Sequence, residues 1–366
     1  MMSKGTTILI MAAGTGGHIF PALSIAEKLR LKGVTTNWLG TAQGMENKLL
    51  EDSDITLHAI KVKGVKGKGV TRMLLAPFMI LVATIQAMRV ISRIKPNCVL
   101  GMGGFVSGPG GLATKIMGKR LLIHEQNAVA GFTNRILSVI ADRVLEAFPN
   151  TFRQRDKVVY TGNPVRAEIS ALNLNTGKAI DADCALRILV LGGSQGAVAI
   201  NELIPAMLSL WDGSGRPSVL HQVGSNNLNQ ARESYIARGI ELNEQCVIKP
   251  FIDDMSSAYA WADLVICRSG ASTVSELAVA GLPSILVPYP YHSDHQQTRN
   301  ALWLSDADAA IVLQQAALTA PSLTGVIVDL DQDRERLSQI GENARKLAIV
   351  DASEKIAQQC MEVASV

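Results

Sequence analysis

The stretch that decides the fold is Thr7–Leu29, TILIMAAGTGGHIFPALSIAEKL. An apolar, β-prone run comes first, glycines follow at 14, 16 and 17, and a helical pattern begins beside His18. Glycines let a backbone approach an oxyanion closely, and a helix N-terminus supplies N–H groups and a partial positive charge. The stretch therefore predicts a strand, an anion-binding loop and a helix. The plainer alternative is a tight turn without a ligand, in which backbone groups satisfy His18.

A nicotinamide dinucleotide is disfavoured as the ligand of this loop. The spacing has no third glycine of a G-x-G-x-x-G motif, and no acidic residue ends a suitable second strand near positions 35–40. The ordinary pKa of a histidine side chain is ~6.5, so a histidine can accept a proton from a hydroxyl at neutral pH, and His18 is a candidate for that role.

The same pattern of strand, glycine loop and helix occurs a second time, 180 residues later. RILVLGGSQGAV at 187–198 repeats the order of strand, glycine loop and helix found at 7–18. The segment between them at 172–184, LNLNTGKAIDADC, is polar and aperiodic. We therefore expect an α/β protein of two Rossmann-like domains with doubly wound parallel sheets, whose loops face each other across a cleft. The expected domains are 1–165 and 166–350, and the helix expected at 351–366 is a candidate to pack back on the first domain.

Short β-rich runs alternate with helical patterns in both halves, as parallel sheets require. The predicted strands are 7–12, 36–39, 56–62, 98–101, 121–124, 143–147 and 158–161, then 187–191, 219–223, 247–250, 264–267, 284–288 and 310–313.

Charge differs strongly between the halves. Residues 1–165 hold 21 basic and 9 acidic side chains, whereas residues 166–366 hold 14 and 23. A basic first half predicts polyanionic partners, which include nucleic acid, anionic lipid headgroups and a diphosphate. The 5 scattered cysteines form no C-x-x-C pair, which indicates a reducing compartment and no structural zinc or disulfide framework. The apolar run at 6–13 is short and has no small-x-small cleavage pattern, so it is expected to be a buried strand rather than a signal peptide.

A second glycine cluster, GMGGFVSGPGG, occupies 101–111. Ser107 is predicted as a helix N-cap with Pro109 in the first turn, where a missing N–H costs little. Gly103 and Gly104 would expose backbone N–H groups beside it. Two such helix starts on one basic sheet would hold a diphosphate between them.

The third cluster, GGSQGA at 192–197, has a competing interpretation. Gly192-x-Ser194-x-Gly196 after a strand is the nucleophile-elbow pattern of serine hydrolases, and His221, His292 and His295 lie downstream. Against a hydrolase, this loop opens the second copy of a repeated unit.

The fourth cluster begins after a predicted strand at Cys267 and continues as RSGASTVSELAVAGLPSILVPYP. Thr273-x-x-Glu276 fits a capping box, which would make Glu276 a local structural residue. The functional alternative places its carboxylate on a ribose diol. Gln296 and Gln297 are amides suited to sugar hydroxyls. His292 and His295 have an H-x-x-H spacing without an obvious third ligand, so no metal site is predicted.

A basic and apolar segment follows the third predicted strand. Basic residues from Lys61 to Arg72 precede sixteen uncharged residues at 73–88, MLLAPFMILVATIQAM. A membrane-spanning helix needs about 20 apolar residues, so this run is expected to be too short to span. The alternatives are a buried crossover helix with a solvated basic flank, or shallow docking on an anionic leaflet. The predicted membrane patch consists of Lys66, Lys68, Arg72, Leu74, Leu75, Phe78 and Met79.

Seven stretches together resemble the MurG family of bacterial N-acetylglucosaminyltransferases of peptidoglycan synthesis. They are GTGGHIFPALSIAEKL, GMGGFVSGPGGLAT, HEQNAVAGFTNR, TGNPVR, LGGSQGA, RSGASTVSELAVAGLPSILVPYP and DHQQTRNA, in the family's order and over essentially the whole chain. The sequence departs from the family's pattern at Ala13, where glycine is usual, and at Phe105, where tyrosine is frequent. The change at Phe105 removes a hydroxyl, and neither removes a group needed by the chemistry below.

The resemblance implies a GT-B glycosyltransferase that moves GlcNAc from UDP-GlcNAc to the C4 hydroxyl of MurNAc in lipid I, with inversion, to form lipid II. It implies His18 as the catalytic base and a diphosphate site for the acceptor at Gly14, Gly103, Gly104 and Ser107. The implied donor site comprises Thr15, Gly16, Gly17, Asn127, Arg166, Ser194, Ile252, Arg268, Ala271, Ser272, Thr273, Val274, Ser275, Glu276, Gln296 and Gln297.

The resemblance further implies a peripheral enzyme on the cytoplasmic face of the inner membrane. Its partners would be UDP-GlcNAc, lipid I and the anionic membrane surface, with no nucleic acid and with room for other cell-wall synthesis proteins. No metal in the protein is expected to be obligatory, and stimulation by Mg²⁺ is left open. The rival enzyme is a UDP-GlcNAc 2-epimerase, and a serine hydrolase using Ser194 is the rival from another class.

Overall fold

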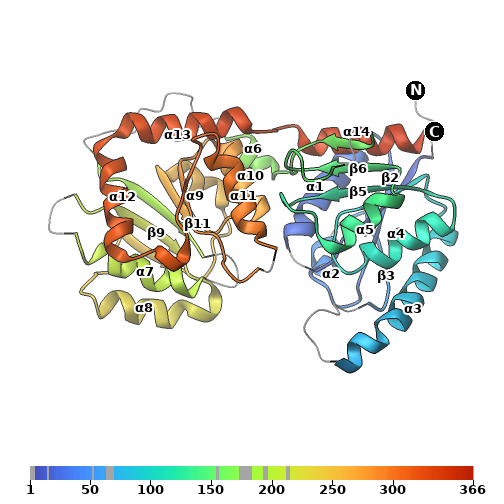
Figure 1. The fold of residues 1–366 in the computed structure, drawn as a ribbon, viewed down its shortest axis with the longest axis horizontal. Helices are drawn as coiled ribbons and strands as arrows, with labels where there is room; N and C mark the ends of the chain where they lie inside the picture. The colour runs from blue at the N-terminus through green and yellow to red at the C-terminus, as the bar shows by residue number, and fades with distance from the viewer. Residues whose placement is uncertain are drawn as a thin grey trace. The chain divides into compact units, whose positions relative to one another are not determined.

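A computed structural model describes residues 5–14, 16–51, 53–62, 70–153, 156–172, 184–192, 197–211, 215–292 and 294–365, with backbone alone at 70–74. The chain divides into two compact units, Met1–Arg166 with Ile349–Val366, and Ala167–Ala348. Each unit is a parallel sheet covered by helices on both faces (Figure 1).

The first unit contains a parallel sheet in the order β3-β2-β1-β4-β5-β6-β7. Its strands are β1 Thr7–Met11, β2 Thr35–Gly40, β3 Thr56–Ala59, β4 Cys98–Gly101, β5 Arg120–Glu125, β6 Arg143–Glu146 and β7 Val158–Tyr160. Its helices are α1 Gly16–Leu31, α2 Met45–Leu50, α3 Val70–Ile94, α4 Ser107–Ile116, α5 Phe132–Ile140 and the C-terminal α14 Ala352–Ala364.

The second unit contains a parallel sheet in the order β10-β9-β8-β11-β12-β13. Its strands are β8 Arg187–Leu191, β9 Ser218–Gln222, β10 Cys246–Lys249, β11 Leu264–Cys267, β12 Ser284–Leu286 and β13 Ile311–Val312. Its helices are α6 Ala167–Ser170, α7 Val198–Leu208, α8 Leu228–Ile236, α9 Met255–Trp261, α10 Ala271–Ala280, α11 Gln296–Ser305, α12 Ala320–Gln332 and α13 Arg334–Leu347, with 3₁₀ turns at Ser225–Asn227 and Gln315–Ala317.

The strands of both sheets match the predicted ones, because burial on both faces leaves a continuous apolar run in the sequence. In β1, Ile8 and Ile10 belong to the core under α1 and α14, whereas Leu9 and Met11 belong to the core on the opposite face. A strand buried on both faces reads as a continuous apolar run, which is what parallel sheets produce.

The C-terminal helix α14 belongs to the first unit. It packs against α1 and β4, and its Ile356, Ala357 and Cys360 are fully buried in the same core as β1. Glu354 adds an ion pair at 2.5 Å to Lys32, the residue that follows α1. The end of the chain therefore completes the hydrophobic face that begins at Ile8.

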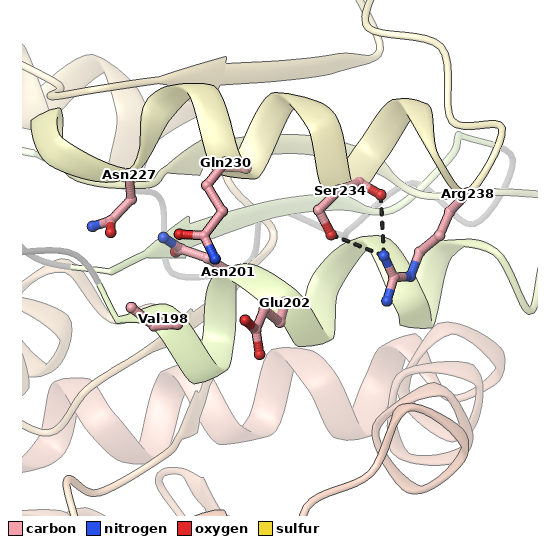
Figure 2. Close-up of a pocket in the computed structure, with 8 residues that line it drawn as sticks. Val198, Asn201, Glu202, Asn227, Gln230, Ser234 and Arg238 are labelled. Atoms are coloured by element: carbon pink, nitrogen blue, oxygen red, sulfur yellow. Dashed lines mark hydrogen bonds between the residues drawn. The ribbon is translucent and has the colours of Figure 1, made fainter.

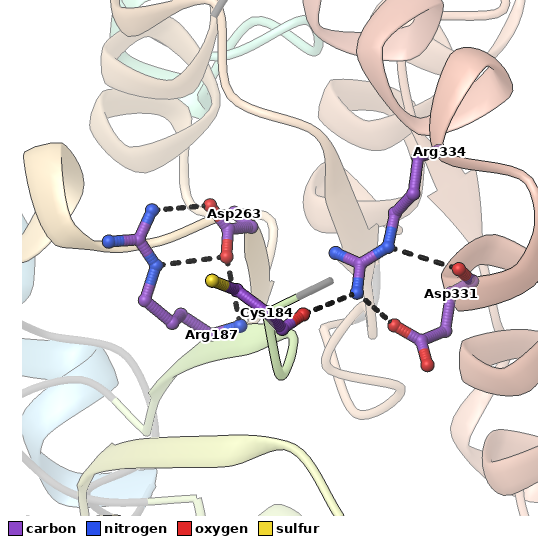
Figure 3. A network of polar contacts seen from close by, with 5 residues as sticks. All are labelled: Cys184, Arg187, Asp263, Asp331 and Arg334. Carbon is purple, nitrogen blue, oxygen red and sulfur yellow. Dashed lines mark hydrogen bonds and ion pairs between the residues drawn. The ribbon is translucent and has the colours of Figure 1, made fainter. Parts of the chain in front are cut away.

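An ion-pair network fixes the entry of the chain into the second sheet (Figure 3). The guanidinium of Arg187 donates to Asp263 from Nε at 3.0 Å and from Nη2 at 2.6 Å, and the Arg187 N–H donates to the same carboxylate at 3.0 Å. Nearby, Arg334 donates to the carbonyl of Cys184 at 3.2 Å and to Asp331. The Arg187–Asp263 contacts join the start of β8 to the residue before β11, and these two strands flank the change in strand order.

Strand order reverses between β1 and β4 in one sheet and between β8 and β11 in the other. Loops diverge at such a switch point, so a crevice opens beyond the carboxyl ends of the strands, and ligands of open α/β sheets bind there. The four glycine clusters are the segments that follow β1, β4, β8 and β11. The fold thus places each pair of clusters at one switch point.

Candidate functional site

The first two glycine clusters meet at the switch point of the first unit. Gly104 packs on the backbone of Ala13, and Gly103 packs on the ring of His18, where an added Cβ would lie 2.7 Å from Nδ1. Gly103 and Gly104 have φ of +100° and +80°, a region that favours glycine. Two loops separated by about ninety residues in the chain are therefore one structural element.

The buried Ser107 side chain stabilises the glycine loop after β4. Its hydroxyl accepts from the Gly103 N–H at 3.0 Å and donates to the Gly103 carbonyl at 2.8 Å, and the side chain is fully buried. The helix begins at Ser107 and its N-cap is Val106, without a side-chain cap. The predicted N-cap role of Ser107 is therefore wrong, because its hydroxyl reaches backward to the loop instead of forward to the helix. Pro109 does lie in the first turn, as predicted.

His18 lies in the first turn of α1 and is half-buried. Its Nδ1 lies 3.2 Å from Oε1 of Gln126, and Nε2 of Gln126 donates to the carbonyl of Met102 at 2.7 Å. Met102 is itself bonded to the end of β1 through its N–H and the Met11 carbonyl, at 2.8 Å. Gln126 was missed by the sequence reasoning, although it lies inside the quoted HEQN stretch.

The Glu125 carboxylate organises the loop after β5. It is buried and accepts from the N–H groups of Asn127 and Gly131, both at 3.0 Å, and from the side chain of Asn134 at 2.9 Å. A carboxylate that accepts several N–H bonds is a strong loop anchor. Asn127, a residue of the predicted UDP-GlcNAc site, is thus held in place by the Glu125 carboxylate.

His124 lies beneath this loop and is fully buried. Its Nε2 donates to the Gly162 carbonyl at 3.0 Å, and Nδ1 has no hydrogen-bond partner among the described residues. Burial lowers the pKa of His124 to about 4, because an imidazolium would lose its hydration there. His124 is therefore neutral at physiological pH and ties β5 to the segment that leads toward Arg166.

Helix α10 follows β11 at the second switch point and contains several residues predicted to bind the UDP-GlcNAc donor. The N-cap of α10 is Gly270, without a side-chain cap, and Thr273 lies inside the first turn. The capping-box interpretation of Thr273 and Glu276 is therefore wrong. The Glu276 carboxylate instead accepts from the hydroxyl of Tyr259 at 3.0 Å.

The segment after β12 is held by Arg268 and Gln297. Arg268 donates to the carbonyls of Val287 and Pro288 at 3.0 and 3.2 Å, and Gln297 accepts from the Tyr289 N–H at 2.8 Å. Burial lowers the pKa of Arg268, whose guanidinium also lies over the Tyr289 ring.

Two further residues of the predicted UDP-GlcNAc site make local hydrogen bonds. The Gln296 amide donates to Asp294 at 2.9 Å, and the Ile252 N–H donates to Gln222 at 3.0 Å. Thr15 and Ser194 lie outside the described residues.

His221, the first histidine after Ser194 in the sequence, is not available as the base of a serine hydrolase. His221 is fully buried, with Nδ1 at 2.9 Å from the Tyr235 hydroxyl and Nε2 at 3.2 Å from Oδ1 of Asn201. Burial lowers its pKa to about 3. His292 stacks edge-on against Tyr289, with ring centroids 5.1 Å apart. Within the described ranges, no three His, Cys, Asp or Glu side chains cluster as metal ligands.

A hollow of about 250 Å³ lies between α7 and α8 in the second unit (Figure 2). Polar side chains dominate its wall, and Arg238 donates to the Ser234 hydroxyl at 2.9 Å. The lining residues are Val198, Asn201, Glu202, Asn227, Gln230, Ala231, Ser234 and Arg238. None of them is a predicted site residue.

Helix α3 buries one stripe and exposes the rest. Ala83, Ala87 and Ile91 are fully buried and pack toward α4, whereas Phe78 and Leu81 are 65% and 56% exposed. The alternative of a buried crossover helix is therefore wrong for the exposed side of α3. The segment Leu75–Ile94 is also long and apolar enough, by length and composition alone, to span a bilayer, so the argument that it is too short is corrected.

Leu75 of the predicted patch is exposed and Met79 is half-buried. Lys66 and Lys68 lie outside the described residues, as do the side chains of Arg72 and Leu74. Exposed apolar side chains also occur on α4, which packs against α3, and on α5, which packs against α4. We call this the apolar face; its described members are Leu75, Phe78, Ile80, Leu81, Ile85, Leu112, Ile116, Phe132, Ile136 and Val139.

Comparison with known proteins identifies close relatives. The glycosyltransferase family 28 N-terminal domain matches residues 8–146, and its C-terminal domain matches residues 187–363. The UDP-N-acetylglucosamine–N-acetylmuramyl-(pentapeptide) pyrophosphoryl-undecaprenol N-acetylglucosamine transferase of Azotobacter vinelandii is 47% identical, over 98% of this chain and 99% of that protein.

Among solved structures, MurG of Acinetobacter baumannii matches with a TM-score of 0.84 and 42% identity, covering 98% of this chain and 99% of that one. A UDP-GlcNAc 2-epimerase from Neisseria meningitidis matches with a TM-score of 0.69 but 12% identity, over 98% of this chain and all of that one. A likeness at that identity shows the fold alone.

Proposed function

The chain belongs to glycosyltransferase family 28, within the MurG family of N-acetylglucosaminyltransferases, and on this premise we propose that it converts lipid I to lipid II. It transfers GlcNAc from UDP-GlcNAc to the C4 hydroxyl of MurNAc in undecaprenyl-pyrophosphoryl-MurNAc-pentapeptide. The observation that carries the proposal is 47% identity across essentially the whole length of both chains.

The chemistry is a single inverting displacement. The C4 hydroxyl oxygen of MurNAc bonds to C1 of GlcNAc while the bond from C1 to the UDP oxygen breaks. The hydroxyl proton passes to His18 and UDP leaves as an anion, which balances the step. A general base contributes about 10²–10⁴-fold to the rate of such a reaction.

On the acceptor side, the paired glycine loops are proposed to hold the lipid diphosphate. Gly14 is exposed and Gly104 is half-buried, just before the start of α4. Gly103 is buried and its N–H donates to the Ser107 hydroxyl, so the expectation that this N–H is exposed is wrong. A helix N-terminus attracts anions through its N–H groups and dipole. Ser107 serves this site by holding the loop, since its hydroxyl is bonded to Gly103.

On the donor side, UDP-GlcNAc is assigned to the second switch point. Glu276 is proposed to bind the ribose diol, the carbonyl of Ile252 the uracil, and the amides of Gln296 and Gln297 the sugar hydroxyls. The start of α10 and Arg268 would offset the charge on the departing diphosphate, so no metal is proposed to be obligatory. The remaining proposed donor contacts are Thr15, Gly16, Gly17, Asn127, Arg166, Ser194 and residues 271–275.

The apolar face is proposed to dock on the anionic cytoplasmic surface of the inner membrane. Apolar side chains contribute about 1.5–3 kcal/mol each when fully removed from water, and the basic residues around 61–72 add attraction to anionic lipid. This placement brings the enzyme to an acceptor whose undecaprenyl chain stays in the bilayer.

The decisive experiment measures transfer of labelled GlcNAc from its UDP donor to a lipid I analogue, with and without EDTA and Mg²⁺. Formation of the disaccharide product supports the proposal, and activity in EDTA supports a metal-independent step. A second reaction contains UDP-GlcNAc alone. Conversion to UDP-ManNAc there, with no transfer in the first reaction, would replace the transferase with the epimerase.

A further inference from the structure

The orientation of the Gln126 amide follows from its surroundings. Gln126 is 2% exposed, and one end of its amide lies 2.7 Å from the Met102 carbonyl. A carbonyl oxygen only accepts hydrogen bonds, so the group facing it is the NH₂. The reversed amide would place two acceptor oxygens in contact inside the protein, an arrangement that costs the energy of an unsatisfied buried group.

The orientation of the Gln126 amide determines which ring nitrogen of neutral His18 carries the proton. With its NH₂ committed to Met102, Gln126 presents Oε1 to Nδ1 of His18 at 3.2 Å. An amide oxygen cannot donate, so the neutral imidazole carries its proton on Nδ1. Nε2 then holds the lone pair, and it has no hydrogen bond to any described residue.

The ring and the amide are both held from other directions. The His18 ring lies against Gly103, which Ser107 fixes through two hydrogen bonds. The main-chain carbonyl of Gln126 accepts from the side chain of Asn163 at 2.9 Å, which fixes the backbone that carries the amide. The amide itself cannot turn without losing its hydrogen bond to the Met102 carbonyl.

We propose that Gln126 is a positioning residue that locks His18 in the Nδ1–H tautomer and so makes Nε2 the atom that receives the acceptor's hydroxyl proton. The catalytic part of this inference rests on the proposed transferase function. The tautomer itself does not depend on it.

His124 and His221 are fully buried and serve as internal references for the other tautomer, in which Nε2 carries the proton. His124 donates from Nε2 to the Gly162 carbonyl. His221 donates from Nε2 to Asn201, whose own NH₂ is committed to the Val223 carbonyl at 2.9 Å. Both therefore carry the proton on Nε2. The chain has 6 histidines in all, so ¹⁵N-labelled histidine gives a spectrum simple enough to assign by single substitutions.

The test is ¹⁵N NMR of the histidine-labelled full chain above pH 7, with His18→Ala to assign the resonances. We expect His18 to show a protonated Nδ1 and an unprotonated Nε2, opposite to His124 and His221. In Gln126→Met, which keeps the length but loses both hydrogen bonds, the His18 signals should move toward a mixture of tautomers. A protonated Nε2 at His18 in the wild type would overturn the proposal.

Kinetics test the catalytic consequence with the same proteins. Gln126→Met should lower kcat by about 10- to 100-fold, a share of what a general base contributes, with KM for UDP-GlcNAc within about twofold. The matched control is Asn37→Ala, which removes a similar amide–histidine contact, Asn37 to His58 at 3.1 Å, and should leave kcat unchanged.

Two outcomes separate the inference from the proposed function. An unchanged kcat in Gln126→Met, with an altered tautomer, would refute the positioning role. Absence of transfer by the wild type would refute the transferase function and leave the tautomer measurement standing. If Gln126→Met does not fold, the wild-type spectrum alone still decides the tautomer.

Discussion

A Cβ atom added to Gly104 would lie 2.0 Å from the carbonyl oxygen of Ala13. The neighbour is backbone, which cannot rotate away as a side chain does. The loop after β4 and the loop after β1 are therefore in direct main-chain contact at the switch point, and the geometry of one constrains the other.

Gly104→Ala is expected to destabilise the protein by about 2–5 kcal/mol, from a positive φ together with the backbone overlap. The measurement is the free energy of unfolding in urea. Gly118→Ala is the matched control, because Gly118 has a φ of +64° and open space around its Cα, so it should lose about 1–2 kcal/mol. Equal losses in the two variants would contradict the proposed contact.

His18→Ala should lower kcat by about 10²–10⁴-fold with little change in KM for UDP-GlcNAc, because a base acts only in the transition state. The assay is GlcNAc transfer to a lipid I analogue. His58→Ala is the control, since that residue lies on β3 beside Asn37. Wild-type kcat in His18→Ala would assign the base to another group.

Glu276→Ala should raise KM for UDP-GlcNAc by about 10- to 100-fold, since a hydrogen bond to a charged group is worth about 1.5–3 kcal/mol. Tyr259→Phe removes the hydroxyl that donates to Glu276 but leaves the carboxylate, so its effect should be several-fold smaller. The measurement is the initial rate as a function of donor concentration. A larger effect in Tyr259→Phe would make Glu276 a structural residue.

Phe78→Ser with Leu81→Ser should reduce binding to vesicles rich in anionic lipid by at least about tenfold, since each side chain gives up about 1.5–3 kcal/mol of burial in the bilayer. Stability in solution should not fall, because both side chains are more than half exposed. Ile236→Ser, at a 63% exposed site on α8, is the control and should bind as the wild type does. Cosedimentation with the vesicles measures the effect.

The free energy of unfolding should fall as pH drops from 6 to 5. The folded-state pKa values of His124 and His221, about 4 and about 3, lie below their ordinary value of 6.5. The unfolded chain therefore binds protons in this range while the folded protein does not. Stability from these residues is complete above pH 6.5 and is lost as pH falls through 4 and 3, at about 1 kcal/mol per pH unit for each histidine between pH 6 and 5. Urea titrations measure the slope, and His221→Gln should reduce it by about half.

The strands and the order of the four glycine clusters could be read from the sequence because both are local patterns. Burial on both faces makes β1 and β8 continuous apolar runs, and glycine marks the turns after them. The α3 part of the apolar face was predicted for the same reason, as sixteen uncharged residues beside a basic run, and Leu75 and Phe78 of the predicted patch are exposed. The part on α4 and α5 was not predicted, because it depends on which helices pack beside one another in the fold.

Hydrogen-bond partners were predicted least well. Ser107 and Thr273 both fit capping patterns, yet Ser107 bonds to Gly103 and α10 begins at Gly270. Short motifs describe what a side chain can reach within its own turn. They contain no information about a competing partner supplied by another loop.

The sequence by itself determined that this chain is a repeated strand–glycine–helix protein, resembling one transferase family along its length, with His18 at the first loop. Only the tertiary structure decided which nitrogen of His18 bears the proton, because the deciding groups, Gln126 and Met102, follow two other strands. Parallel sheets bring the carboxyl ends of distant strands together at the switch point, so contacts between those ends are set by topology and not by neighbours in the chain.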